Sequence, residues 1–268
     1  MQLAPGTTLV SFLAGGQVGD VHPAASQLVS LFNGMRSHVG WEVMPSWVGL
    51  TAQRPQGLRV AERLMPARDG LSLLGLNLVS VVQELNNSKQ RNPFLALVGA
   101  GLELDVEGIN VKAAGDGVTA GLFLRLAALE REIPSADLST GQLAWLCWAA
   151  LLSMRAGHTL VTLDQPEDNL HFALIRTLVN QLCDFSRHTP VVVATHSNDF
   201  LDALPDPASQ LLLFRLGGDM KALVTRPSKK ELAAWMEQEG QRAGSLRRGG
   251  VLDALAVPAT PRRGKSRT

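Results

Sequence analysis

The sequence is short of cysteines, basic residues near its start and long apolar runs, and each shortage excludes a class of protein. Two cysteines, Cys147 and Cys183, in 268 residues are too few for a disulfide framework or a zinc cluster. The first basic residue is Arg36, so the charged start of a secretory signal is missing. The longest near-continuous apolar run, residues 143–154, is too short to span a bilayer. We therefore expect a cytoplasmic protein with no membrane partner.

Charged residues are also scarce, at 18%, while apolar residues make up 46%, a balance that excludes a disordered or coiled-coil chain. The apolar residues suffice for one sizeable core, or for one core plus a small appendage. The formal net charge is only +1. From Gly240 to the end, however, one acidic residue, Asp253, accompanies seven basic ones: Arg242, Arg247, Arg248, Arg262, Arg263, Lys265 and Arg267. Such a tail suits contact with nucleic acid or an acidic partner, and a solvated, disordered tail explains the same charges.

The second half of the chain predicts a parallel sheet. Residues 159–163 and 191–194 are continuous apolar strands, as expected where helices cover both faces of a sheet, and residues 211–214 read as a third. Helices expected at residues 143–154, 172–187 and 199–203 alternate with them. Alternating strands and helices imply an α/β fold, a mostly parallel sheet with flanking helices, whose ligands bind at the carboxyl ends of the strands.

The first half of the chain gives weaker signals. The pattern predicts strands at residues 8–14 and 41–50, strand-like runs at 94–99 and 102–106, and helices at 23–32, 71–85 and 122–132. We expect three parts: residues 1–134 as the N-terminal part of the domain, 135–226 as its core, and 227–268 as a C-terminal helix with a basic, partly disordered tail.

Polar residues follow both of the best strands. The sequence Asp164-Gln165-Pro166-Glu167-Asp168 follows the first, and Thr195-His196-Ser197 follows the second. An acidic loop beside a histidine at one edge of a parallel sheet suits a metal–phosphate site, because aspartate can hold Mg²⁺ and the histidine can bind a phosphate. Taken singly, the first segment is better explained as a solvated turn and the second as a helix cap.

A third segment, Leu138-Ser139-Thr140-Gly141-Gln142, lies just before an apolar helix. Backbone N–H groups and the helix dipole at such a start attract an anion. Ser139 can also act simply as the N-cap of that helix.

Together these segments resemble the ABC-type ATPases. Leu138 to Gln142 resembles the signature motif, Leu160 to Asp164 the Walker B strand, Asn169-Leu170-His171 the D-loop, and Thr195-His196 the switch-histidine loop. The spacings also fit, with 22 residues from Gln142 to Asp164 and 32 from Asp164 to His196. The wording LDQPEDNLHF and ATHSNDFLDAL is similar to stand-alone AAA-family ATPases of DNA repair and phage defence, the SMC/RecF/OLD-like and TrlF-like proteins.

The resemblance implies a P-loop NTPase fold that binds ATP and Mg²⁺ and works as a homodimer or with a hetero-subunit. Asp164 would hold the metal, Glu167 or Gln165 would position the attacking water, and His196 would sense the γ-phosphate. Ser139, Thr140, Gly141 and Gln142 would contact ATP held by the partner subunit.

The sequence departs from that family at two points. Gln165 stands where most members have a glutamate, and no Gly-x-x-x-x-Gly-Lys-Ser/Thr loop occurs in the chain. The glycine loop at residues 14–21 has Asp20 in place of the lysine and Val21 in place of the hydroxyl residue. Three explanations fit the missing lysine: a P-loop that lies upstream of a truncated or split chain, a degenerate P-loop at residues 14–21, or a glycine loop that is an unrelated turn. A hydrolysing ATPase and a non-hydrolysing binding or regulatory module therefore both remain open.

Overall fold

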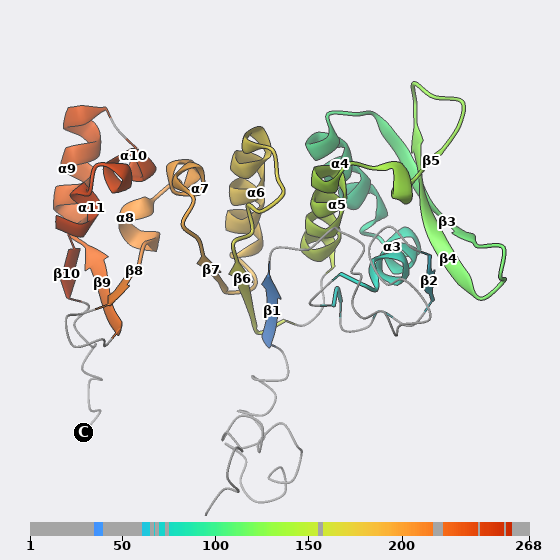
Figure 1. Ribbon diagram of the computed structural model, residues 1–268, viewed down its shortest axis with the longest axis horizontal. Coiled ribbons are helices and arrows are strands. Elements are labelled where there is room, and N and C mark those ends of the chain that lie inside the picture. Colours follow the sequence, from blue (N-terminus) through green and yellow to red (C-terminus); the bar gives the residue numbers. More distant parts are fainter. Residues whose placement is uncertain are drawn as a thin grey trace, which may run out of the picture. The chain divides into compact units, whose positions relative to one another are not determined.

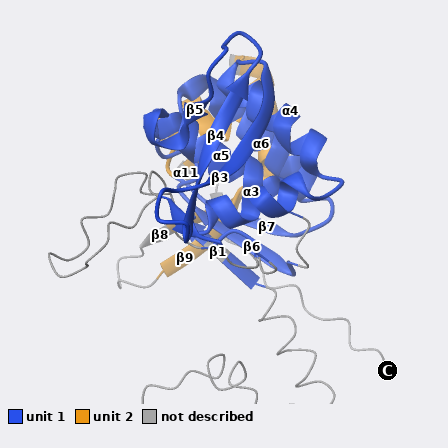
Figure 2. Cartoon of the chain, turned by 90° about the vertical axis from the view of Figure 1, so that its right-hand side faces the viewer, with its two compact units in different colours: residues 1–195 blue, residues 196–268 orange. Residues whose placement is uncertain are grey.

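The computed structural model describes residues 35–39, 61–64, 67, 70–72, 75–154, 158–216, 222–240, 242–254 and 256–258. The chain divides into two compact units, Met1–Thr195 and His196–Thr268 (Figure 2). The glycine loop at residues 14–21, and the elements expected at residues 8–14, 23–32 and 41–50, lie outside the described residues. In the described part, no helix is long and apolar enough to cross a membrane.

A parallel sheet forms the centre of the first unit. Its strands lie in the order β1-β6-β7 and are β1 (Met35–Val39), β6 (Leu160–Asp164) and β7 (Val191–Ala194). Helix α6 (Phe172–Phe185) makes the crossover between β6 and β7, as Figure 1 shows. Val161 and Leu163, which share one face of β6, are buried, whereas Val192 of β7 is 56% exposed. The expected burial of both faces is therefore wrong for the described residues, and β6 and β7 alternate as strands covered on one face do. The expected α/β fold with a parallel sheet and flanking helices is confirmed.

A second, antiparallel sheet belongs to the same unit. Strands β2 (Glu62–Arg63), β4 (Thr119–Leu126) and β3 (Val106–Ala113) lie in this order, and β5 (Ile133–Pro134) pairs with β4. The helix expected at residues 122–132 is therefore wrong. Leu122, Leu124 and Leu126 are buried at every second position, the period of a strand that covers a core with one face.

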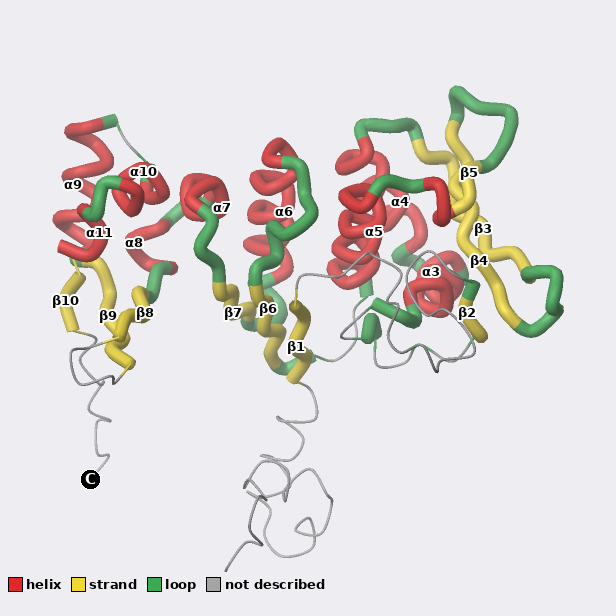
Figure 3. The backbone as a smooth tube through the Cα atoms, in the orientation of Figure 1, coloured by secondary structure: helices red, strands yellow, loops and turns green. Residues whose placement is uncertain are grey.

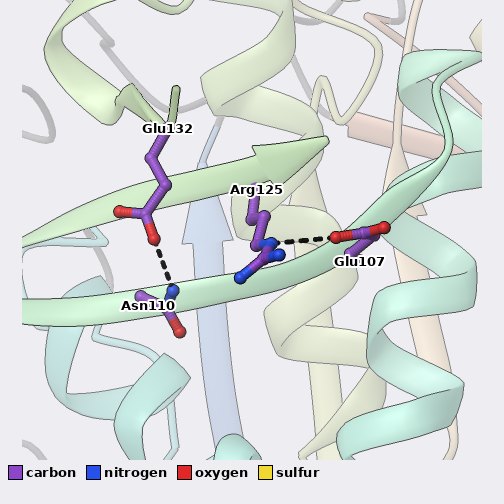
Figure 4. Close-up of polar contacts among 4 residues, drawn as sticks. All are labelled: Glu107, Asn110, Arg125 and Glu132. Carbon is purple, nitrogen blue, oxygen red and sulfur yellow. Dashed lines mark hydrogen bonds and ion pairs between the residues drawn. The ribbon is translucent and has the colours of Figure 1, made fainter. Parts of the chain in front are cut away.

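The other face of this sheet carries polar side chains that neutralise one another. Arg125 Nε donates to a carboxylate oxygen of Glu107 at 2.9 Å, and the Asn110 side chain donates to Glu132 at 2.7 Å (Figure 4). Lys112 also forms an ion pair with Glu132. These contacts pair acids with bases across the strands and leave this face without a surplus of one charge.

Three helices complete the first unit: α3 (Leu78–Asn86), α4 (Arg91–Leu102) and α5 (Thr140–Ser153). Helix α5 packs against α3, α4 and α6, and ten of its fourteen residues are buried. At the crossing with α4, an added Cβ on Gly101 would lie 1.9 Å from the Trp145 ring, so only glycine fits. The Trp145 indole N–H donates to the Leu97 carbonyl at 3.0 Å.

The strand-like runs expected at residues 94–99 and 102–106 are wrong for most of their length. Phe94 and Val98 are four residues apart, and Leu95, Val98 and Gly101 follow one another at intervals of three, so these residues form one buried side of α4. The helix expected at 71–85 is found from Leu78 onward, while the expected helices at 143–154 and 172–187 correspond to α5 and α6.

The second unit begins at His196 and has its own core. Its helices are α7 (Asn198–Ala203), α8 (Pro207–Gln210), α9 (Lys229–Glu239), α10 (Ala243–Arg248) and α11 (Val251–Ala254). Its antiparallel sheet has the order β10-β9-β8, with β8 (Leu213–Leu216), β9 (Ala222–Pro227) and β10 (Ala256–Pro258). Figure 3 shows these helices in red and these strands in yellow. Its buried core consists of Leu201, Leu211, Leu232, Ala243, Leu246 and Leu252.

Two expectations fail in this unit. The third parallel strand expected at residues 211–214 is wrong, because β8 pairs antiparallel with β9 in a separate sheet. The basic segment after Gly240 is not a disordered tail between residues 242 and 254, because α10 and α11 form there and bury Ala243, Leu246 and Leu252. Apolar residues between the arginines explain the difference, since they complete the core of this unit.

Candidate functional site

The acidic loop begins at the carboxyl end of β6. Asp164 is the last residue of that strand, is exposed, and lies in register with Val39 of β1 and Ala194 of β7. The next residue, Gln165, adopts a left-handed conformation with φ 48°, and its N–H donates to the Ala194 carbonyl at 2.8 Å. The chain thus turns sharply directly after Asp164, which leaves this carboxylate at the edge of the sheet where ligands of parallel strands bind.

Glu167 links the loops that follow β6 and β7. The Thr195 hydroxyl donates a hydrogen bond to Glu167 Oε1. The other carboxylate oxygen, Oε2, is buried and has no hydrogen-bond donor among the described residues. A buried carboxylate oxygen is costly unless it is paired, so this atom fits a cation or a donated water proton. The backbone holds the loop closed, with the Leu170 N–H donating to the Glu167 carbonyl at 3.0 Å.

The predicted signature segment caps α5. The Ser139 hydroxyl accepts the Gln142 N–H at 3.2 Å, and the Gln142 side chain accepts the Ser139 N–H at 2.8 Å. This is a capping box, so the N-cap role expected for Ser139 is confirmed. The hydroxyl still has its own proton to donate. Thr140 and Gly141 form the first turn of the helix.

Gly141 brings the signature segment against the predicted D-loop. An added Cβ on Gly141 would lie 2.9 Å from the Asn169 carbonyl oxygen, closer than side-chain carbons approach such atoms. Asn169 itself has φ 64°, which turns its carbonyl toward α5 at the end of the acidic loop. Segments about 28 residues apart in the chain are therefore in contact, and this contact requires glycine at position 141.

His196 is exposed and is the first residue of the second unit. Its carbonyl accepts a hydrogen bond from the Arg247 guanidinium. Ser197 then caps α7, its hydroxyl accepting the Phe200 N–H at 3.2 Å. The side-chain oxygen of Asn198 is buried without a donor among the described residues. The histidine therefore stands at the start of a capped helix, with its backbone fixed and its side chain facing solvent.

Sequence reasoning missed three contributors: Thr195 as the partner of Glu167, Asn169 as the partner of Gly141, and the buried His38. Strand β1 is short and was not predicted, so nothing marked His38 as part of the sheet. Burial lowers the pKa of His38 to about 4, with smaller contributions from His158 and Arg36. Burial likewise lowers the pKa of His158. Both imidazoles are thus held neutral, His38 on β1 beside β6 and His158 just before β6 begins.

The donor set of this site fits Mg²⁺ that is held together with a nucleotide. Among the described residues, no group of three or more His, Cys, Asp or Glu side chains could hold a metal alone. An exposed Asp164 at a strand end, with the orphaned oxygen of Glu167 on the same loop, instead suits an ion whose other ligands are phosphate oxygens and water.

Comparison with known families gives the class of protein to which the chain belongs, that of AAA domains. A family model described as "AAA domain, putative AbiEii toxin, Type IV TA system" matches residues 52–202, more than half of the chain. The chain belongs to this family of AAA domains.

Solved structures of SMC proteins are similar to parts of the chain. One, from work on ATP-driven dimerization and DNA-stimulated activation of SMC ATPases, has 12% identity and a TM-score of 0.43 and covers 61% of this chain and 98% of its own. An SMC head domain from Thermotoga maritima has 16% identity and a TM-score of 0.38, with 55% of this chain and 51% of that chain covered. A Pyrococcus furiosus Smc head domain bound to the C-terminal domain of ScpA has 12% identity and a TM-score of 0.43, with 59% and 39% covered. No curated protein matches the chain.

Proposed function

We propose that the chain is an ATP-binding and ATP-hydrolysing ABC/SMC-like ATPase of the DNA-repair or anti-phage-defence type, which acts as a dimer with composite sites. The observation that carries this proposal is the hydrogen bond from Thr195 to Glu167, because it joins the loops after two neighbouring parallel strands. The description of the matching family, which names a toxin of a type IV TA system, supports the defence side of the proposal.

Asp164 is the residue that would hold Mg²⁺, since its carboxylate is exposed at the end of β6. When bound, the ion neutralises negative charge on the phosphates. Either Glu167 or Gln165 orients the attacking water. Glu167 has one oxygen bound to Thr195 and a second that lacks a donor, so it can accept a water proton. Gln165 directly follows Asp164 and can align water through its amide, as a glutamine does in some GTPases.

His196 hydrogen-bonds the terminal phosphate, for which its exposed imidazole is suited. The segment Ser139-Thr140-Gly141-Gln142 contacts the ATP of a second subunit. Two features support this role: the start of α5 provides backbone N–H groups and a favourable dipole, and the capped Ser139 hydroxyl still has a proton to donate. The partner is a second copy of the chain or a related subunit.

A second candidate function is a non-hydrolysing pseudo-ATPase, or a truncated piece of an ATPase, that acts as a binding or regulatory module. It is favoured by Asp20, which stands where a phosphate-binding lysine is expected, and by Gln165, which stands in place of a carboxylate. A carboxylate at position 20 would repel the β- and γ-phosphates of ATP.

Measurements of Mg²⁺·ATP binding and hydrolysis by the purified chain distinguish the hydrolysing ATPase from the non-hydrolysing module. The Asp164→Ala variant is expected to lose Mg²⁺-dependent turnover by at least about a hundredfold, since the metal ligand is removed. Asp168→Ala, which removes an exposed acid from the same loop, is the matched control and should retain turnover. Light scattering with and without ATP measures dimer formation.

Turnover that survives in Asp164→Ala would refute the metal assignment. ATP binding without turnover in the unaltered chain would favour the regulatory module instead. If the chain neither binds ATP nor changes mass when ATP is added, the proposed ATPase is refuted for this chain alone.

A further inference from the structure

The C-terminal helix α10 contacts the backbone that surrounds His196. The Arg247 guanidinium donates to the His196 carbonyl, and the Gly244 N–H donates to Asp202 Oδ1 of α7 at 2.7 Å. The Arg242 guanidinium also reaches the Asp202 carbonyl, at 3.5 Å. Both helices belong to the second unit, and their contact joins residues about 40 to 50 positions apart.

Asp202 acts as the missing cap of α10. The N-cap position of this helix is occupied by Arg242, which makes no side-chain cap hydrogen bond. The Asp202 carboxylate instead accepts an N–H from the first turn, where the helix dipole also favours a negative charge. The start of α10 is therefore stabilised by α7 and depends on the position of α7.

Gly244 allows the two backbones to approach. An added Cβ at this position would lie 2.1 Å from the Asn198 carbonyl oxygen and 2.7 Å from the carbonyl carbon. Backbone atoms cannot move aside as the end of a side chain can, so any larger residue would push α10 away from the first turn of α7. Leu201 of α7 and Leu246 of α10 lie in the same buried core, which closes the contact around this glycine.

Arg247 holds His196, the residue directly before Ser197, the N-cap of α7. It lies in the last turn of α10 and binds the carbonyl of His196 itself, so the peptide group between His196 and Ser197 is held from outside its own loop. Hydrogen bonds from a guanidinium are stronger than neutral ones. The neighbouring Arg248 has the same charge and is exposed, which provides a matched control.

We propose that α10 is a positioning element for the switch histidine, with Arg247, Gly244 and Asp202 as its positioning residues. The segment 242–248 sets where the His196 backbone lies, and any ligand that moves α10 also moves the histidine. This inference rests on the proposed function for its role in catalysis, whereas the mechanical link itself is independent of nucleotide.

The link is testable by NMR because the chain has one His–Ser pair, His196–Ser197. Protein labelled with ¹³C-carbonyl histidine and ¹⁵N-serine gives one carbonyl–amide correlation, which reports the His196 carbonyl. Arg247→Ala is expected to shift this peak, Arg247→Lys to restore most of its position because a donor remains, and Arg248→Ala to leave it in place. Gly244→Ala should also shift it, whereas Gly249→Ala, whose nearest contact is a side chain at 3.7 Å, should not.

Steady-state Mg²⁺·ATP turnover of the same variants measures the consequence for the site. Loss of one charge-assisted hydrogen bond predicts a kcat about tenfold lower in Arg247→Ala with KM changed less than about twofold, and recovery in Arg247→Lys. An unmoved peak in Arg247→Ala, or an equal shift in Arg248→Ala, overturns the proposal. A shifted peak in a chain that never hydrolyses ATP supports the positioning element and contradicts the proposed ATPase, so the two failures are distinguishable.

Discussion

The buried His38 predicts that the first unit loses stability in mild acid. His38 lies on β1 in register with Leu163 of β6, is 1% exposed, and has its pKa lowered by burial to about 4. In the unfolded chain, its pKa returns to about 6.5. The unfolded state therefore binds the proton first. The stability from the neutral imidazole is present above pH 6.5 and is lost as the pH falls from 6.5 to 4.

The size of this effect follows from the two pKa values. Because each pH unit between them corresponds to about 1.4 kcal/mol, the loss by pH 4 is about 3 kcal/mol. That is a large share of the 5–15 kcal/mol that typically separates folded from unfolded states. His158, whose pKa is also lowered by burial, adds to the loss in the same direction.

Urea unfolding at pH 7.5, 6, 5 and 4.5, followed by tryptophan fluorescence, measures this dependence, with Trp145 and Trp148 as buried reporters in the first unit. The control is His38→Gln, which keeps a polar side chain of similar size but has no proton to gain. The variant should lose clearly less stability than the unaltered chain over this pH range. Equal pH dependence in both proteins would refute the assignment of the acid-sensitive group to His38.

Three further predictions concern the glycines and the acidic loop. Gly101→Ala should lower the free energy of unfolding by about 3 kcal/mol, because the added methyl group overlaps the Trp145 indole. The control Gly115→Ala, which has nothing within 4 Å, should change it by less than about 0.5 kcal/mol in the same urea assay. Gly141→Ala should lower the free energy of unfolding by about 1 kcal/mol, because the 2.9 Å approach to a backbone oxygen outweighs the better helix propensity of alanine. It should also reduce ATP turnover about tenfold if the two segments must touch. Gln165→Glu should raise ATP turnover about tenfold, since a carboxylate accepts a proton from the attacking water better than an amide does. A lower rate would instead indicate that Glu167 orients this water.

The core of the fold was predictable where local pattern and tertiary burial agree. Strands β6 and β7 are continuous apolar runs and α6 is an amphipathic helix, so length and hydrophobic pattern located them, while Ser139 also marked the start of α5. Most of strand β4 was mistaken for a helix because the run at residues 122–132, rich in leucine, alanine, glutamate and arginine, favours a helix locally. Its pairing with β3 decides otherwise, and such long-range pairing is not visible in a window of ten residues.

The candidate site was predictable as a set of segments and not as a set of contacts. Motif order and spacing identified Asp164, His196 and the start of α5. The partnership of Thr195 with Glu167 depends on the register between β6 and β7, and the approach of Gly141 to Asn169 depends on how α5 packs. Both are set by packing between distant segments, for which a single sequence gives no signal. The same holds for Arg247, which the charge pattern assigned to a solvated tail.

Helix α5 has a practical consequence for measuring motion in this protein. A helix buried around most of its circumference cannot slide or rotate without breaking contacts on several sides at once, since protein interiors are close-packed. The residues just before it therefore provide a fixed origin for distance measurements. A spin label on exposed Asp137, directly before this helix, would serve as the reference for labels placed elsewhere in the first unit.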